Sequence, residues 1–445
     1  MMMIQKNKNY NVFAQFKKII DNISTKYLNL IRGNKSSSFT RHRKVSVELI
    51  FLFMFAFKGK SYKNELEYFY NDISILKNVS TWGFIKQRIK FNPEAIKEMN
   101  KDYLMDYYNL SQKDKTLKGY YILAGDGSDI VVPSTKENKE IFGYRKDENR
   151  QPAMAKLSVI YDCINKMILD IQLETYKFPE IELVNRHLEI VREILKDKKK
   201  IYIFDRGYPD IKLILNLKDK EEKFLFRLRS TDFKREQKSM RFNDEWIDII
   251  YDRARTNQFR NDFNLVERLL KENIHLRFVK IPIITSDGKK VEEVLLTNLE
   301  NEEFDTEKIK DLYHMRWDIE TSYRALKSNL KLEEFSGTKP QIIAQDIYIN
   351  VFVFNFIQDI ITETKDIPQE KYKYKMKINN NYAIGLIKTY FLKIFFEKKI
   401  RKRNKLMIEL IDKISYNLVP IRNERSYSRN LTPINKSRMS YKYSY

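Results

Sequence analysis

The stretch from residue 119 to residue 229 constrains the fold most, because strand and helix patterns alternate along it in a definite order. Five runs have the length and composition of strands: Tyr120 to Asp126, Lys156 to Cys163, Met167 to Thr175, Ile201 to Phe204 and Lys223 to Arg229. A helical pattern from about Glu180 to Leu195 separates the third run from the fourth, and a second helix separates the fourth from the fifth. This order predicts an α/β core with a mixed five-stranded sheet and covering helices.

Four further regions surround the first part of this core, which spans residues 116–229. We expect a helical region over residues 1–115, a β-rich insertion over 230–300, the last part of the core over 301–360 and a basic helical end over 361–445. The insertion carries two strand patterns, Leu276 to Thr285 and Val291 to Thr297, joined by a turn-forming Ser-Asp-Gly-Lys. A long helix is predicted after it, from about Asp305 to Leu332.

The positive charge of the chain is concentrated at its two ends. The formal net charge is +23; residues 1–48 hold 10 Lys or Arg against 2 Asp or Glu, and residues 361–445 hold 20 against 7. The middle of the chain is nearly neutral. An AT-rich genome can raise the lysine content of a whole chain, but it does not explain this clustering. We therefore expect both ends to contact a polyanion such as DNA.

A basic group near the N-terminus, Thr40-Arg41-His42-Arg43-Lys44, lies just before an apolar helix expected from Val45 to Phe57. We expect Arg41, Arg43 and Lys44 to contact DNA. Residues 1–115 are then interpreted as a small helical DNA-binding unit that can be removed while the core stays folded.

Cysteine usage and the apolar runs exclude several classes of protein. Cys163 is the only cysteine, which excludes disulfides within the chain and zinc fingers of the Cys/His type. The longest apolar runs, near residues 49–57 and 351–354, are well short of the roughly 18 residues that span a bilayer. The N-terminus has no signal-peptide pattern. We therefore expect a cytoplasmic protein without membrane contact.

Two aspartates stand directly after buried strand patterns. Asp126 is followed by Gly127-Ser128-Asp129, and Asp205 begins the segment Asp-Arg-Gly-Tyr. A buried strand end tolerates a carboxylate only where it is paired or functional, and the carboxyl edge of α/β sheets commonly carries the chemistry. Taken singly, a turn is the better explanation of Asp126 and an equally good one of Asp205. Asp129 competes with Asp126 for the functional role.

A third acidic residue lies in the helix predicted after the insertion. At about 100° per residue, Tyr313, Arg316, Glu320 and Lys327 fall on one narrow stripe, which an apolar stripe borders. Such a helix can bury its apolar stripe while it turns Glu320 toward the two aspartates. The spacing alone also permits an ordinary solvated face.

The spacing of Tyr, two residues, Arg, three residues, Glu, six residues and Lys resembles the signature of transposases of the insertion-sequence-four group. Tyr313, Arg316, Glu320 and Lys327 meet it at every spacing. The segments that begin at Asp126 and Asp205 resemble the two aspartate motifs of that group, and the order of strands and helices resembles an RNase H-like core. The resemblance implies that Asp126, Asp205 and Glu320 are catalytic ligands of two Mg²⁺ ions, with Mn²⁺ able to substitute.

The resemblance also implies cut-and-paste DNA transposition. Water would release a 3′-hydroxyl at the transposon end, and this hydroxyl would attack the opposite strand to form a hairpin and later attack target DNA. Arg316 and Lys327 would hold phosphates, Tyr313 would hydrogen-bond a phosphate or stack, and Trp317 would stack on a displaced base or pack within its helix. The implied partners are the terminal inverted repeats, target DNA and a second copy of the chain.

Other DNA-processing classes are poorly matched. None of the four histidines has Arg three residues later, as a tyrosine recombinase requires, and Gly59-Lys60-Ser61 lacks the first glycine of a P-loop. Two alternatives remain: a host nuclease with the same core that cuts without joining, and a decayed copy that binds DNA without catalysis. The presence of all three acids argues against decay.

Overall fold

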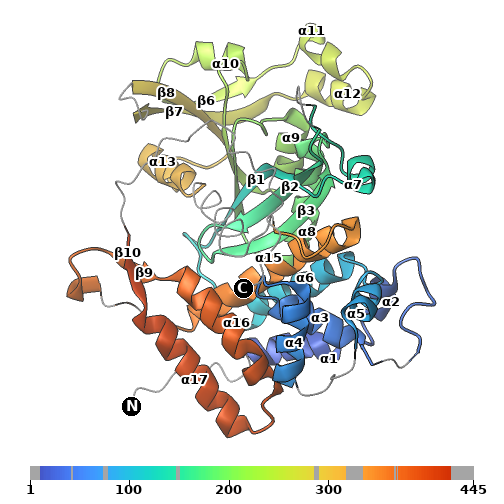
Figure 1. Ribbon diagram of the computed structural model, residues 1–445. Helices are drawn as coiled ribbons and strands as arrows, with labels where there is room; N and C mark the ends of the chain where they lie inside the picture. The colour runs from blue at the N-terminus through green and yellow to red at the C-terminus, as the bar shows by residue number, and fades with distance from the viewer. Residues whose placement is uncertain are drawn as a thin grey trace.

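A single large sheet organises the fold. The computed structural model describes residues 11–41, 44–73, 79–146, 151–284, 290–316, 334–364, 367 and 369–421. Within them, eight strands form one sheet in the order β3-β2-β1-β4-β5-β8-β7-β6 (Figure 1). The strands are β1 Tyr121–Val131, β2 Met154–Asp162, β3 Met167–Thr175, β4 Lys200–Phe204, β5 Lys223–Arg227, β6 Asp244–Ile249, β7 Ile274–Ile284 and β8 Lys290–Thr297.

The five strands expected for the core are β1 to β5, and they occur in the predicted order. Strand β1 pairs antiparallel with β2, and β2 with β3, whereas β1 pairs parallel with β4, and β4 with β5. A parallel pair needs a crossover, which α8 (Glu180–Ile194) and α9 (Ile211–Asp219) supply as predicted. The mixed α/β class is therefore confirmed. Strand β1 continues five residues past Asp126, and a short helix, α7 (Lys136–Ile141), follows it.

The β-rich insertion expected over residues 230–300 extends the core sheet. Strand β8 pairs antiparallel with β5 through Leu225↔Thr297 and Arg227↔Leu295, and β7 and β6 follow on its other side. The insertion also contains helices: α10 Lys234–Ser239, α11 Arg253–Thr256, the 3-10 turn η1 Asn257–Phe259 and α12 Phe263–Lys271. The sheet grows to eight strands because β5 would otherwise present an unpaired edge of backbone groups.

The two ends of the chain are helical, as expected, and their helices lie together in the lower half of the view in Figure 1. They are α1 Val12–Asp21, α2 Leu28–Arg32, α3 Val47–Ala56, α4 Tyr62–Ile73, α5 Thr81–Arg88, α6 Glu94–Leu110, α15 Pro340–Thr362, α16 Asn380–Phe396 and α17 Ile400–Tyr416. The C-terminal part also has the 3-10 turn η2 (Gln369–Lys371) and two short antiparallel strands, β9 (Met376–Ile378) and β10 (Leu418–Pro420), which flank α16 and α17 in the sequence. In the ranges that the structure describes, none of these helices is both long and apolar enough to cross a membrane.

Phenylalanine rings from both ends of the chain share one apolar core. The ring of Phe16 in α1 lies 4.4 Å from that of Phe55 and 5.1 Å from that of Phe356, measured between centroids. Phe55 in turn lies 4.7 Å from Phe391 of α16. Helix α6 packs against β3, α8 and α15. This packing argues against the expectation that residues 1–115 can be removed while the core stays folded, because their removal would expose the shared core to water.

The helix expected from Asp305 to Leu332 is described only in its first part, α13 (Thr306–His314). Its N-terminus is capped by Asp305, whose side chain accepts a hydrogen bond from the Lys308 N–H. At its end the Arg316 N–H bonds to the Tyr313 carbonyl, three residues back, so the chain winds more tightly there than an α-helix. The uniform 100° spacing assumed from Tyr313 onward therefore fails at Arg316. Residues 317–333 lie outside the described residues.

Gly125, directly before Asp126, is packed too closely to accept a side chain. A Cβ atom there would lie 2.4 Å from Cε1 of Phe204 on the neighbouring strand β4. We expect Gly125→Ala to lower the free energy of unfolding by about 1–3 kcal/mol, because the Phe204 ring or β1 must shift. Urea denaturation followed by circular dichroism measures this loss.

Gly385→Ala is the matched control for that substitution. An added methyl group at Gly385, in α16, meets nothing within 4 Å, so alanine there should be neutral or stabilising. Equal stability of Gly125→Ala and the wild-type protein would contradict the close packing of the Phe204 ring against Gly125.

Candidate active site

Asp126 and Asp205 lie at the same level on neighbouring strands. The parallel β1–β4 ladder ends with the pair Ala124↔Ile203, and each aspartate is two residues beyond it. Neighbouring strands run about 4.8 Å apart, and residues at equivalent positions of a parallel pair point to the same face. The two carboxylates therefore project side by side from one face of the sheet, where β4 ends.

Asp129, the competing residue, belongs to the opposite face. It is an odd number of residues from Asp126, so the alternation of side chains along β1 turns it the other way. Its Oδ1 lies 2.8 Å from Nζ of Lys156, and the same Nζ lies 3.1 Å from Oε1 of Glu180 in α8. This geometry groups Asp126 with Asp205 and leaves Asp129 in an ion-paired cluster on the α8 side.

Asp205 is surrounded by donors from three elements. The Tyr313 hydroxyl donates to its Oδ1 at 3.2 Å, and the Arg206 N–H donates to the same oxygen at 2.8 Å. Nη2 of Arg316 lies 3.6 Å from Oδ2, and Nη1 of Arg227 lies 3.7 Å from Oδ1. Burial raises the pKa of Tyr313, so its hydroxyl keeps the proton that it donates. The end of α13 is thereby held directly against the end of β4.

The first two residues of the four-residue signature therefore both lie at Asp205. Tyr313 and Arg316 are both buried, and both contact the Asp205 carboxylate from α13 and the turn after it. The other three residues expected in this stretch, Trp317, Glu320 and Lys327, lie outside the described residues.

Sequence reasoning missed Arg227 and Glu293. Arg227 ends β5 and reaches both Asp205 and the buried carboxylate of Glu293 on β8. Nη2 of Arg206 also lies 2.8 Å from Oε1 of Glu293. The only signal for Arg227 was its place at the end of a strand pattern. Glu293 could not be found, because its position depends on the pairing of β8 with β5, and it lies 66 positions after Arg227 in the sequence.

The pKa of the Tyr208 hydroxyl is affected by both aspartates. Burial raises the pKa of its hydroxyl well above the ordinary value, and the charges of Glu180, Asp126 and Asp205 raise it further. Tyr208 is therefore neutral, and it lies close enough to both aspartates to sense their charge.

The donor chemistry of the pair fits a hard divalent cation. Asp126 and Asp205 offer carboxylate oxygens, the ligands that Mg²⁺ prefers. Over the ranges that the structure covers, no group of three His, Cys, Asp or Glu side chains is close enough to hold a metal ion. Glu320, the third expected ligand, falls outside those ranges.

The basic N-terminal residues lie in a different part of the chain. Arg41 and Lys44 are exposed, on the connection between α2 and α3, whereas Arg43 lies outside the described residues. Their exposure leaves both side chains accessible to a ligand.

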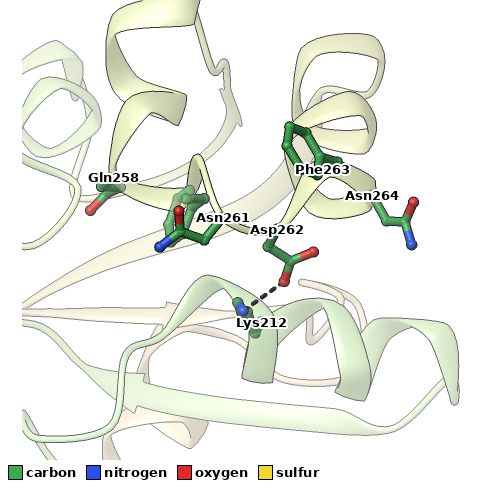
Figure 2. A pocket seen from close by; sticks show the side chains of 7 residues that line it. Lys212, Gln258, Asn261, Asp262, Phe263 and Asn264 are labelled. Carbon is green, nitrogen blue, oxygen red and sulfur yellow. Dashed lines mark hydrogen bonds and ion pairs between the residues drawn. The ribbon is translucent and has the colours of Figure 1, made fainter.

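One surface pocket of the described residues lies away from the aspartates. It measures about 510 Å³ and is lined by Lys212 of α9 and by the chain from Gln258 to Asn264 at the start of α12 (Figure 2). Nζ of Lys212 and Oδ2 of Asp262 lie 2.7 Å apart across it. Asp126 and Asp205 remain the candidate site, because Asp205 lies beside Tyr313, Arg227 and Arg316. Among the described residues that line the pocket, the ion pair is Lys212 with Asp262.

Comparison with known proteins finds similarity to transposases. The family model described as a transposase DDE domain matches residues 117–356. The InsL protein of insertion sequence element IS186A, from Escherichia coli (strain K12), and the transposase of insertion sequence element IS421, from Escherichia coli, are each 33% identical to the chain over 102 residues. That segment covers 23% of this chain and 27% of each relative's length.

Among solved structures, the chain is similar to a piggyBac transposase in a synaptic complex with hairpin DNA, studied by cryo-electron microscopy. The TM-score is 0.44 and the sequence identity 11%, over 98% of this chain and 90% of that chain.

Proposed function

Because the chain belongs to the transposase DDE domain family, whose model matches more than half of its residues, we propose that it is a DNA transposase. It cuts DNA at transposon ends and joins the released ends to target DNA. The observation that carries the proposal is the placement of Asp126 beside Asp205, with Tyr313 and Arg316 of the signature against Asp205.

The strand order supports an RNase H-like catalytic core. Three antiparallel strands, β3-β2-β1, continue into the parallel strands β4 and β5, with α8 and α9 as the crossovers. In our proposal the insertion between β5 and α13 belongs to the same sheet, which brings Arg227 and Glu293 to the edge of the site.

Asp126, Asp205 and Glu320 are the proposed metal ligands. Members of this family use divalent metal ions, and we propose two Mg²⁺ ions, with Mn²⁺ as a substitute. Two such ions supply a nucleophile that is activated near neutral pH and stabilise the leaving oxygen. The chain contributes the carboxylates on two rigid neighbouring strands and, through Glu320, on the segment after α13.

The remaining signature residues are assigned to the DNA. Arg316 and Lys327 hold phosphates near the cleaved end, since a guanidinium or ammonium group binds a phosphate oxygen strongly. Tyr313 orients Asp205 through its hydroxyl and adds a contact to the DNA. Trp317 is assigned to stacking on a displaced base. Arg316 is already beside Asp205, so a bound phosphate there would lie next to the metal ligands.

The basic ends are the proposed grips on DNA outside the site. Exposed Arg41 and Lys44, with Arg43 between them, contact the terminal repeats, and residues 361–445 add further phosphate contacts or a dimer interface. Two copies on paired ends would place one site at each end. Because the substrate is chromosomal DNA, we assign the activity to the bacterial cytoplasm.

A host nuclease with the same core is the alternative, and joining separates the two. The test incubates the full chain with Mg²⁺, a duplex that carries the inverted repeats flanking its gene, and a supercoiled target plasmid. A transposase yields plasmid covalently joined to the duplex. A product set of cut ends alone, with joined DNA absent even when pre-cleaved ends are supplied, would favour the nuclease.

A further inference from the structure

The backbone around Asp126 has no side chains of its own on the α8 face. Gly125 and Gly127 flank the aspartate, and glycine leaves the chain freer to move than any other residue. Side chains of Glu180 and Tyr208 lie against this backbone instead. A Cβ atom at Gly127 would lie 3.2 Å from the Glu180 carboxylate and 3.4 Å from the Tyr208 hydroxyl.

A buried series of hydrogen-bonded polar side chains ends at the backbone of Asp126. Ser158 of β2 is the register partner of Gly127, and its hydroxyl lies 3.4 Å from the carbonyl oxygen of Asp126. Nε2 of His187, in α8, is 2.9 Å from the Ser158 Oγ, and Nδ1 of the same ring is 2.7 Å from Oδ2 of Asp170 on β3. Ser158 and His187 are 1% exposed and Asp170 is 6% exposed.

This series of polar side chains is also hydrogen-bonded at the end that lies farther from Asp126, at Asp170. Gln172 donates to Oδ2 of Asp170 at 2.6 Å, and Nζ of Lys97 in α6 donates to Oε1 of Gln172 at 3.1 Å. Burial alone would raise the pKa of Asp170, but the hydrogen bond and charge of His187 outweigh it and lower the pKa. Asp170 is thus an ionised acceptor, which assigns the Nδ1 proton to His187. The Ser158 hydroxyl lies between Nε2 of His187, at 2.9 Å, and the Asp126 carbonyl oxygen, at 3.4 Å, so it links the ring to the Asp126 backbone.

We propose that Ser158, His187 and Asp170 are positioning residues for the catalytic carboxylate. They contact the backbone of Asp126 from the α8 face of the sheet, whereas its side chain projects from the opposite face. The contact thereby fixes the direction of that side chain. None of the three is accessible to DNA, which excludes a serine nucleophile despite the Ser-His-Asp order. Such supporting hydrogen bonds commonly change metal affinity by one to two orders of magnitude. The inference rests on the proposed function, because it requires Asp126 to be a metal ligand.

Ser158→Ala tests the inference, because it removes the hydroxyl and changes the volume least. In the full-length protein, we expect the Mn²⁺ concentration for half-maximal end cleavage to rise about tenfold, with most of the rate recovered at saturating Mn²⁺. Hydrogen exchange of the backbone amides of residues 125–128, measured without metal or DNA, should become faster in the same variant. Specific end binding in EDTA should be unchanged.

Ser111→Ala is the matched control, since Ser111 is equally buried but lies at the end of α6. It should leave the Mn²⁺ requirement and exchange at residues 125–128 as in the wild type. Asp170→Asn is the second variant and decides the matter if Ser158→Ala does not fold. A folded variant with the wild-type Mn²⁺ requirement and wild-type exchange at residues 125–128 would overturn the inference.

Failure of the proposed function would look different. If Asp126→Asn cleaved ends like the wild type, Asp126 would not be a ligand, whatever Ser158→Ala did. If Asp126→Asn were inactive but Ser158→Ala were unchanged in both measurements, only the positioning role would fall. If the wild-type protein cleaved nothing, hydrogen exchange at residues 125–128 would still decide whether Ser158 holds the Asp126 backbone.

Discussion

Asp205→Asn is expected to reduce cleavage at transposon ends by about a thousandfold or more, while specific end binding in EDTA stays intact. The substitution removes a negative charge that faces the proposed metal site and keeps the shape of the side chain. The amide oxygen can still accept from the Tyr313 hydroxyl, so we expect the variant to fold. Cleavage of an end-labelled duplex in Mg²⁺ and in Mn²⁺, compared with gel-shift affinity, measures the two effects separately.

Asp219→Asn is the control for this substitution. Asp219 is also an arginine-paired aspartate, with 2.6 and 2.7 Å contacts to Arg268, but it lies at the exposed end of α9. Its cleavage rate should equal that of the wild-type protein. Rapid cleavage by Asp205→Asn would remove Asp205 from the proposed ligand set.

Arg277→Met is expected to lower the free energy of unfolding by about 3–5 kcal/mol, because it leaves a partly buried carboxylate without its partner. Arg277 on β7 is fully buried and binds both oxygens of Asp244, at 2.7 and 2.5 Å. It also donates to the carbonyls of Leu299 and Phe304, at 3.1 and 2.6 Å, on the chain that leads into α13. The insertion is thereby tied to the helix that carries Tyr313.

Arg268→Met provides the comparison, since Arg268 makes a similar two-bond contact to Asp219 at the surface. Exposed ion pairs of this kind contribute about 0–1 kcal/mol, so this variant should unfold at nearly the wild-type urea concentration. Similar losses for both arginines would show that burial of the Arg277 pair does not matter.

The core of the fold could be predicted because its signals are local. The alternation of apolar residues located β1 to β5 and α8, and it placed Asp205 directly after β4. The end of β1 was placed at Asp126, although the strand continues five residues further, to Val131. What brings the two aspartates together, the parallel β1–β4 ladder, follows from the strand-helix-strand order. The ion pair of Lys156 with Asp129 could not be predicted, because it depends on the pairing of β1 with β2, which no local pattern reveals.

Features that depend on contacts between distant segments could not be predicted. The insertion joins the sheet because β8 finds the free edge of β5, and its strand patterns are the same for a separate unit or a continued sheet. The N-terminal helices appeared separable because nothing local shows that Phe16 packs on Phe356, 340 residues later. The contact of Arg316 with Asp205 likewise joins segments that are far apart in the sequence.

Glu320→Gln in the joining assay tests the central claim most directly, because Glu320 is the position that the signature predicts and the described geometry leaves untested. With Mg²⁺ or Mn²⁺, cognate ends and a target plasmid, the wild-type chain should produce joined DNA. Glu320→Gln should bind the ends with wild-type affinity and produce neither cut nor joined DNA. Wild-type cutting and joining by Glu320→Gln would contradict a catalytic site built from Asp126, Asp205 and Glu320.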